Sequence, residues 1–317
     1  MKSKTQILEK KSKLQGIIVL LLITIAVYSV FKIIKTDNFG SADNVFSYFQ
    51  QALLPSVAAC GLYFIVVMGL FDFSIGANIV LSSIVGVLLS NHFGYPGFIL
   101  GAVIVGTLIG LVNGIVYIKL RIPSIIVTIG LMIVYECIGA LVASGNVMTL
   151  SSNMNAFGRA PFNIILALIS FALAYIFLQY TKIGIYTYAI GSNESVAENI
   201  GIHVKKYKVI AFVLAGFFSG IMSILTVSYG GAMMASTNMA SMSRSFTPLM
   251  GCFFALAFKK TVNPVISIFC GELIITMILN GLITIGIPTT MQNVVIGITL
   301  LFIIILTSNK GKDTVVK

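Results

Sequence analysis

Charged side chains are scarce in this sequence. Asp, Glu, Lys and Arg make up only 9% of its 317 residues, whereas a soluble globular domain carries about 25%. This scarcity excludes an ordinary soluble protein. Hydrophobic residues make up 58% instead, and unbroken apolar runs of about 20 residues, long enough to span a bilayer, recur along the chain. Because only helices and closed barrels satisfy their backbone in lipid, and these runs do not alternate, the sequence predicts an all-α integral membrane protein.

Residue patterns typical of an enzyme or a metalloprotein are also missing. The sequence contains no G-x-x-x-x-G-K-[ST] phosphate loop, so any ATP must be bound by another subunit. The four cysteines lie within apolar segments without metal-type spacing, and His92 and His203 stand alone in loops. No nucleophile–base pair or pair of nearby carboxylates favours a membrane enzyme. We therefore expect no catalytic residue, no metal site and no cofactor.

Ten apolar segments are predicted as transmembrane helices. They cover residues 15–34, 48–70, 75–90, 97–119, 123–142, 161–180, 207–229, 245–258, 262–284 and 289–308. The predicted organisation is an N-terminal tail at 1–14, a transmembrane domain at 15–308 that contains a polar insert at 181–208, and a C-terminal tail at 309–317.

Lysine and arginine predict which side of the membrane each loop faces. With ten spans, sixteen of the twenty basic residues lie on the side of the two termini, and only Lys32, Lys35, Arg159 and Arg244 lie on the other. By the positive-inside rule, both termini and the polar insert are cytoplasmic. This rule also accounts for the net charge of +11, so that charge is no reason to expect a nucleic acid partner.

The polar insert is the longest water-soluble stretch and is predicted to carry one short helix. Gly191 opens it, Ser192 or Asn193 caps the helix start, Glu194 lies in the first turn where the helix dipole favours an anion, and Gly201 closes it. A helix of this length is marginal alone in water. It therefore needs a partner against which to pack.

Small residues recur at four-residue spacing in two predicted spans. This spacing places them on one helix face, where they allow close approach of a neighbouring helix. The positions are Gly106, Gly110 and Gly114 in the fourth span and Gly216 and Gly220 in the seventh. Asn113, beside Gly114, is interpreted as a donor of an interhelical hydrogen bond.

Polar residues near or within the apolar spans are the candidates for a solute pathway. Asp72 and Ser74 lie just before the third span and are two of these candidates. Asp72 is predicted to cap that span, with contact to solute or ATPase as the alternative. Glu136 and Glu272 fall mid-span, where a charge costs at least about 2.5–3.5 kcal/mol. They either line a pathway or are protonated acids bonded to a neighbouring helix. Asn280, eight residues after Glu272, lies on roughly the same helix face.

A methionine-rich stretch at 233–242 is extracytoplasmic on this topology. It contains Met233, Met234, Met239 and Met242. Because methionine side chains adapt to varied surfaces, the stretch is either a flexible surface for a partner protein or a loop that re-enters the membrane.

Two motifs resemble the ribose-type ABC sugar importer permeases. Residues 188–202 read YAIGSNESVAENIGI, similar to that family's cytoplasmic loop YA-x-GGNE-x-A-x-x-x-GI, and residues 72–76 read DFSIG, similar to its D-L-S-V-G signature. The resemblance covers essentially the whole chain. In that family the loop helix transmits closure of a cytoplasmic ATPase to the pore. The positions that inherit this coupling role are Gly191, Ser192, Asn193, Glu194, Ala197 and Gly201.

The resemblance also implies partners and a location. It implies a multi-pass subunit of the bacterial cell membrane that pairs with a second permease subunit, docks a cytoplasmic ABC ATPase pair, and receives a small solute from an extracytoplasmic binding protein. The expected solute is a pentose, a hexose or a related molecule, and the remaining surface contacts membrane lipid.

Three departures from the family pattern bear on the solute and on subunit pairing. Ser192 replaces a glycine of the loop motif, Tyr135-Glu136-Cys137 stands where members tend to have Tyr-Arg-Gly, and residues 251–260 keep little of a glycine-rich stretch. The identity of the solute and the choice between homodimer and heterodimer stay open. A rival hypothesis is a self-contained secondary transporter or channel in which the mid-membrane carboxylates relay protons or cations.

Overall fold

The computed structural model describes residues 2–35, 39–259, 261–288, 291–292, 294–299 and 301. Within this part of the chain, seven helices are long and apolar enough to cross a membrane. This count differs from the ten predicted spans for three reasons. One of the seven helices contains a chain reversal and so covers two predicted spans, and the segment at 245–258 forms a helix that is too short to be counted. Most of the predicted span at 289–308 lies outside the described residues. The tail at 309–317 lies outside them as well.

The chain divides into two compact units. Unit 1 comprises residues 1–56 and 249–317, and unit 2 comprises residues 57–248. The chain passes between the units inside two helices, close to Pro55 in one and at Pro248 in the other. Since proline donates no backbone hydrogen bond and crowds the preceding turn, both passages lie where the helix ladder is interrupted.

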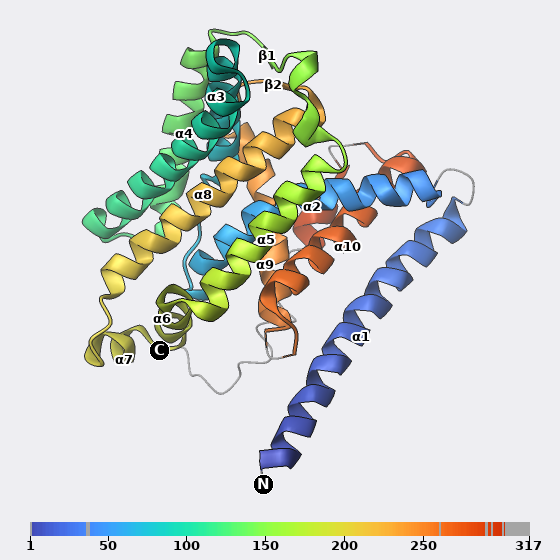
Figure 1. Ribbon diagram of the computed structural model, residues 1–317, viewed down its shortest axis with the longest axis vertical. Helices are drawn as coiled ribbons and strands as arrows, with labels where there is room; N and C mark the ends of the chain where they lie inside the picture. Colours follow the sequence, from blue (N-terminus) through green and yellow to red (C-terminus); the bar gives the residue numbers. More distant parts are fainter. Residues whose placement is uncertain are drawn as a thin grey trace. The chain divides into compact units, whose positions relative to one another are not determined.

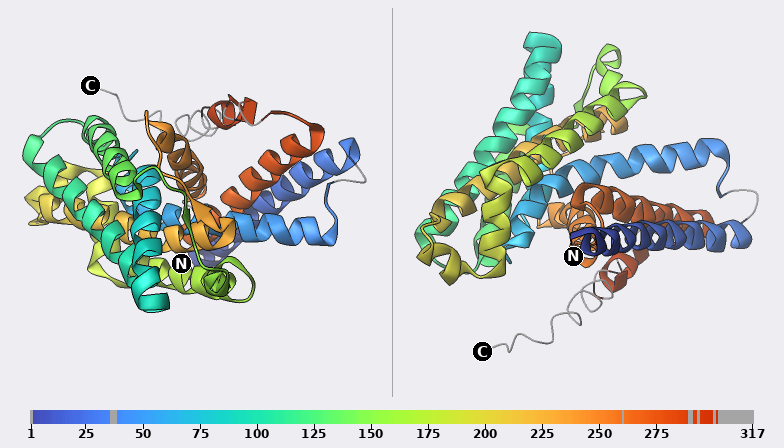
Figure 2. Two further views of the ribbon diagram at one scale, coloured as in Figure 1. Left: turned by 90° about the horizontal axis from the view of Figure 1, so that it is seen from above. Right: turned by 60° about the horizontal axis from the view of Figure 1, so that its bottom comes forward.

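Unit 1 is a set of packed apolar helices. It contains α1 (Lys2–Ile34), the first part of α2 (Ala42–Val67), the second part of α9 (Ser243–Ala257) and α10 (Pro264–Ile285). Helices α1 and α10 lie side by side (Figures 1 and 2), and Gly281 of α10 leaves room for the ring of Phe31 in α1. Local signals set both ends of α10, because Asn263 caps its first turn and Gly286 ends it at φ 92°.

Unit 2 is built around a helical hairpin. Helix α3 (Ile75–Leu120) is 46 residues long, which as one straight helix would extend about 69 Å, more than twice the thickness of the hydrocarbon core. The helix breaks at Gly94, where φ is 59° and ψ is −146°. A Cβ on Gly101 would lie 3.5 Å from the Cα of Gly86, although these residues would be about 22 Å apart along an unbroken helix. The two arms therefore fold back on each other and correspond to the spans expected at 75–90 and 97–119.

Unit 2 also contains three further long helices, the second part of α2 and the start of α9. The three helices are α4 (Ser124–Ala143), α5 (Phe162–Tyr180) and α8 (Val204–Gly230). Helix α8 runs along α3 (Figures 1 and 2). The core between them contains Ile84 and Phe98 of α3 and Ile224 of α8.

The two ends of unit 2 differ in structure. At one end, β1 (Met148–Thr149) pairs antiparallel with β2 (Ala232–Met233), next to the short 3₁₀ helices η1 (Ser152–Met154) and η2 (Ala156–Gly158). At the other end lie the helices of the polar insert (Figure 1). Helix α8 has 27 residues and a length of about 40 Å, so it connects opposite faces of a bilayer. The sheet and the insert therefore lie at opposite ends of a helix that is long enough to cross a bilayer.

The insert contains two helices where one was predicted. They are α6 (Lys182–Ser192) and α7 (Glu194–Asn199). Gly191 lies inside α6 and does not open the segment, and Asn193 is the corner between the two helices. Helix α6 was missed because Gly184 and Gly191 obscured its helical pattern, although its cap, Thr181, accepts a hydrogen bond from the backbone N–H of Ile183.

Candidate functional site

The corner between α6 and α7 is set by local capping. The side chain of Asn193 accepts a hydrogen bond from the backbone N–H of Val196 at 3.1 Å and so caps α7. At the other end of α7, Gly201 adopts φ 89°, and the N–H of Ile202 donates to the carbonyl of Ala197 at 3.0 Å. Of the two cap residues considered from the sequence, Asn193 is the one that caps the helix. The buried Ala197 turns this short helix toward the rest of unit 2.

Helix α6 rests on the end of α2. Gly191 lies so close to the carbonyl oxygen of Val67 that a Cβ would overlap it. Beside it, the rings of Tyr63 and Tyr188 meet edge to face with centroids 6.5 Å apart. Burial raises the pKa of Tyr188. These contacts require glycine at position 191 for reasons of space.

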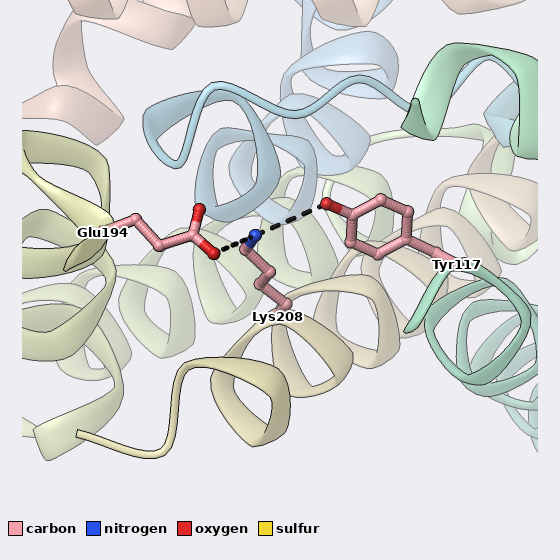
Figure 3. Close-up of polar contacts among 3 residues, drawn as sticks. All are labelled: Tyr117, Glu194 and Lys208. Carbon is pink, nitrogen blue, oxygen red and sulfur yellow. Dashed lines mark hydrogen bonds and ion pairs between the residues drawn. The ribbon is translucent and has the colours of Figure 1, made fainter. Parts of the chain in front are cut away.

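Helix α7 is tied to unit 2 by a buried lysine (Figure 3). Lys208, in the first turns of α8, is only 7% exposed, and its Nζ lies 2.7 Å from Oε1 of Glu194. The same Nζ lies 3.4 Å from the hydroxyl oxygen of Tyr117 and 5.6 Å from the centroid of its ring. A buried lysine is stable only when paired, and here an anion and an aromatic face supply the pairing. The sequence marked Glu194 but not Lys208 or Tyr117.

Apolar side chains are exposed on this water-facing insert. Ile185 of α6 is 61% exposed, Val196 of α7 is 53% exposed, and Ile200 is 70% exposed. All three belong to the short helices of the insert or to the residue that follows them. We refer to Ile185, Val196 and Ile200 as the insert surface.

The glycines of α3 and α8 face one another. A Cβ on Gly106 would lie 2.6 Å from the carbonyl oxygen of Gly216, and a Cβ on Gly220 would lie 2.8 Å from that of Ala102. Gly110 is equally restricted by the carbonyl of Phe212. Farther along, a Cβ on Gly114 would lie 3.0 Å from the Cα of Val209. The two backbones therefore touch from Ala102 to Gly114, over about 18 Å of helix, which ties the second arm of α3 to α8.

Asp72 belongs to a buried polar cluster. Its Oδ1 accepts from the backbone N–H and the hydroxyl of Ser74, at 2.8 and 2.6 Å, and its Oδ2 accepts from the amide of Asn113 at 3.2 Å. The amide of Asn113 also donates to Ser74 at 2.6 Å, and its oxygen accepts from the hydroxyl of Tyr135 at 2.8 Å. The cluster joins both arms of α3 to α4. Asp72 thus bonds the residue just before the helix, and not an N–H of its first turn.

Glu136 holds the segment before α9. Its two carboxylate oxygens accept the backbone N–H groups of Met239 and Ser241, at 2.9 and 2.8 Å. These donors flank the start of the 3₁₀ helix η3 (Ala240–Met242). Both oxygens therefore act as hydrogen-bond acceptors for backbone N–H groups. These contacts attach α4 to a neighbouring segment, and a role of Glu136 in lining a solute pathway stays a prediction.

The start of α3 meets the same segment. Gly76 leaves no room for a Cβ beside the carbonyl oxygen of Ser241, and its N–H donates to the hydroxyl of Ser245 at 2.9 Å. That hydroxyl donates in turn to the carbonyl of Phe73 at 2.9 Å. The DFSIG motif is therefore a contact point between α3 and the start of α9, which requires the glycine at its end.

The two candidates in unit 1 bond to different helices. Oε1 of the fully buried Glu272 accepts the backbone N–H of Gly251 at 3.2 Å, and Gly251 leaves room for that oxygen. The amide of Asn280 donates to the side chain of Gln51 at 3.0 Å and to the carbonyl of Thr276 at 2.9 Å. Glu272 therefore contacts α9 and Asn280 contacts α2. Within the described residues, no group of three or more His, Cys, Asp and Glu side chains is placed to hold a metal ion.

Comparison with known proteins gives consistent matches over nearly the whole chain. A family model described as "Branched-chain amino acid transport system / permease component" matches residues 44–304. The ribose import permease protein of Escherichia coli (strain K12) is 24% identical over 323 residues, which cover 97% of this chain and 96% of that protein. The ribose import permease protein of Bacillus subtilis (strain 168) is 27% identical over 289 residues, 88% of each chain.

A third relative carries a different sugar name. The galactose/methyl galactoside import permease protein of Escherichia coli (strain K12) is 26% identical over 322 residues, which cover 93% of this chain and 94% of that protein. No solved structure matches the chain.

Proposed function

The chain belongs to the branched-chain amino acid transport system / permease component family, which includes the permeases of ABC sugar importers, and we propose that it is the membrane-spanning subunit of an importer that moves a sugar. Its relatives are named as permeases, which are transport subunits and not enzymes. Family membership and the apolar spans make it a multi-pass protein of the bacterial inner membrane.

The sugar class rests on the names of the relatives. Two are ribose permeases and one is a galactose permease, whereas the family description refers to branched-chain amino acids. Uptake of ribose, galactose and leucine, measured side by side, tests this part of the proposal. Uptake of ribose or galactose but not of leucine is the expected result, and the reverse would contradict the sugar assignment.

The insert surface is the observation that carries the proposal of ATPase coupling. Ile185, Val196 and Ile200 are exposed on the insert, which the predicted topology places in water, and apolar groups exposed there support contact with a protein partner. Because α6 and α7 are also packed onto unit 2 through Gly191 and Lys208, a force on the insert reaches the spans. A cytoplasmic ABC ATPase is the partner that such an arrangement suits.

The opposite end of unit 2 suits an extracytoplasmic binding protein. The β1–β2 sheet and the methionine-rich stretch lie there, and Met234 and Met239 are exposed. Flexible thioether side chains adapt to a partner that binds and leaves in each cycle. A second permease subunit, identical or different, completes the proposed importer, and the exposed apolar residues of the spans contact that subunit or lipid.

Purification from a membrane tests the proposal against the rival of a self-contained transporter or channel. We expect an ABC ATPase to co-purify with the chain, and uptake into proteoliposomes to require ATP and a binding protein. Replacement of Ile200 by Asp should reduce co-purification, whereas the same change at Ile104, exposed on a span, should act through insertion instead. Flux driven by an ion gradient through the purified chain alone would establish the rival.

A further inference from the structure

Lys208 is buried, whereas the neighbouring lysines in the sequence are exposed. Lys205 and Lys206, in the same turn, are exposed, whereas Lys208 is 7% exposed. A lysine side chain loses conformational entropy when it is held in one position, and its ammonium group loses hydration. The contacts with Glu194 and Tyr117 offset both costs.

The three residues of this contact come from three helices. Glu194 is the first residue of α7, Tyr117 lies in the last turn of α3, and Lys208 lies near the start of α8. Figure 3 shows the ammonium group between the carboxylate and the phenol. The buried end of the ion pair is thus on the spans, and the end that is 53% exposed is on the insert.

Helices α3 and α8 are packed so closely that a force on Lys208 acts on both of them. Their glycine faces place backbone against backbone from Gly106 to Gly114, and the rings of Tyr117 and Phe212 lie tilted against each other with centroids 5.6 Å apart. Such a contact resists sliding because small residues interlock without flexible side chains between them. A displacement of Lys208 therefore moves the α3–α8 pair as one body.

Helix α6 has a separate attachment. It contacts the end of α2 through Gly191 and Tyr188, while α7, of only six residues, begins at the Asn193 corner. We propose that Lys208 is the positioning residue through which a displacement of α7 is passed to the α3–α8 pair, while α6 acts on α2. This inference rests on the proposed function, because it takes α6 and α7 as the helices on which the ATPase docks.

The ion pair is well suited to this role. Glu194 lies in the first turn of α7, where the free backbone N–H groups favour a carboxylate. The 2.7 Å distance between Nζ and Oε1 is that of a charge-assisted hydrogen bond, which is directional as well as strong. Without it, α7 is still attached at the Asn193 corner, through the apolar contact of Ala197 and through residues 200–203 that lead into α8, but it lacks a directional side-chain bond to α8.

The test measures coupling and not only transport. The permease is reconstituted with its co-purified ATPase and binding protein, and both uptake and ATP hydrolysis are recorded. For Lys208→Met we expect the ATPase to remain bound and to hydrolyse ATP at about the wild-type rate, while uptake per ATP falls about tenfold, the size of a typical coupling energy. Lys206→Met removes an equal charge from an exposed position of the same turn and should leave the ratio of uptake to ATP hydrolysis unchanged. An unchanged ratio in Lys208→Met would overturn the proposal.

A second set of variants remains informative if Lys208→Met fails to insert. Glu194→Gln removes the same ion pair from its exposed end and should also lower uptake per ATP. The double reversal Glu194→Lys with Lys208→Glu should recover part of the loss seen in each single reversal. Loss of ATPase binding in Glu194→Gln, or no recovery in the double reversal, would contradict a positioning role. If the wild-type chain binds no ATPase, the proposed function itself fails, which is a distinct outcome.

Discussion

The carboxylate of Glu136 in α4 receives the backbone N–H of Ser241 at 2.8 Å, from a segment 105 residues farther along the chain. Its other oxygen receives the N–H of Met239. A mid-span acid that would be costly in lipid is thus used to hold the turn that leads into α9. This relationship requires a side chain with two acceptor oxygens at position 136.

Replacing Glu136 by Gln should destabilise the protein. The amide has one acceptor oxygen, so its NH₂ group would face a backbone donor and leave it without an acceptor. We expect a loss of about 1–3 kcal/mol, measured as a lower unfolding temperature in detergent. Asp43→Asn, at an exposed position in the first turn of α2, is the control and should have little effect. Wild-type stability in Glu136→Gln would show that the two backbone bonds contribute little.

Replacement of Glu272 by Gln should be tolerated. There only Oε1 accepts a hydrogen bond, from Gly251, while Oε2 has no partner among the described residues. A glutamine can keep the acceptor toward Gly251, so we expect the stability to change by less than about 1 kcal/mol. Glu272→Leu should cost more, because it leaves that N–H buried without an acceptor. A larger loss in Glu272→Gln than in Glu272→Leu would contradict this interpretation of the Glu272 contact.

Asn113 should matter more than Tyr135 within the buried cluster. Asn113→Leu leaves Asp72 without its amide donor and the hydroxyl of Tyr135 without its acceptor, whereas Tyr135→Phe removes one hydroxyl that donates to Asn113. We expect a loss of about 2–3 kcal/mol for the first and about 1 kcal/mol for the second. Unfolding in detergent gives the order, with Tyr229→Phe at an exposed position as the control. Equal losses would indicate that the cluster tolerates an unpaired Asp72 oxygen.

The glycine contact between α3 and α8 allows a matched comparison. Gly110→Ala places a Cβ against the carbonyl of Phe212, whereas a Cβ at Gly130 of α4 meets nothing within 4 Å. We expect Gly110→Ala to lose about 1–3 kcal/mol through strain and to reduce transport, and Gly130→Ala to be neutral or slightly stabilising. Thermal unfolding and uptake, measured on both variants, test the contact. Equal unfolding temperatures and equal uptake in Gly110→Ala and Gly130→Ala would mean that α3 and α8 separate easily at Gly110.

Most of the spans could be predicted from the sequence because hydropathy is a local property. The expected segments at 15–34, 123–142 and 161–180 agree closely with the apolar helices Gln15–Ile34, Ser124–Ala143 and Phe162–Tyr180. The turn near Gly94 was also expected, from the polar and glycine-containing stretch around it. The number of spans, the side on which the termini lie and the roles of the candidate pathway residues stay predictions.

What the sequence alone determined, then, is the class of protein, the family motifs and the polar insert. Only the tertiary structure decided what the individual polar residues contact. Glu136 meets donors more than 100 residues away, Lys208 reaches Tyr117 across 91 positions, and α6 rests on Val67 at the end of a distant helix. Composition and spacing report on neighbours along the chain, whereas a buried charge selects its partners by the packing of helices in three dimensions. For that reason the lysine that ties the insert to the spans could not be identified until the helices were placed.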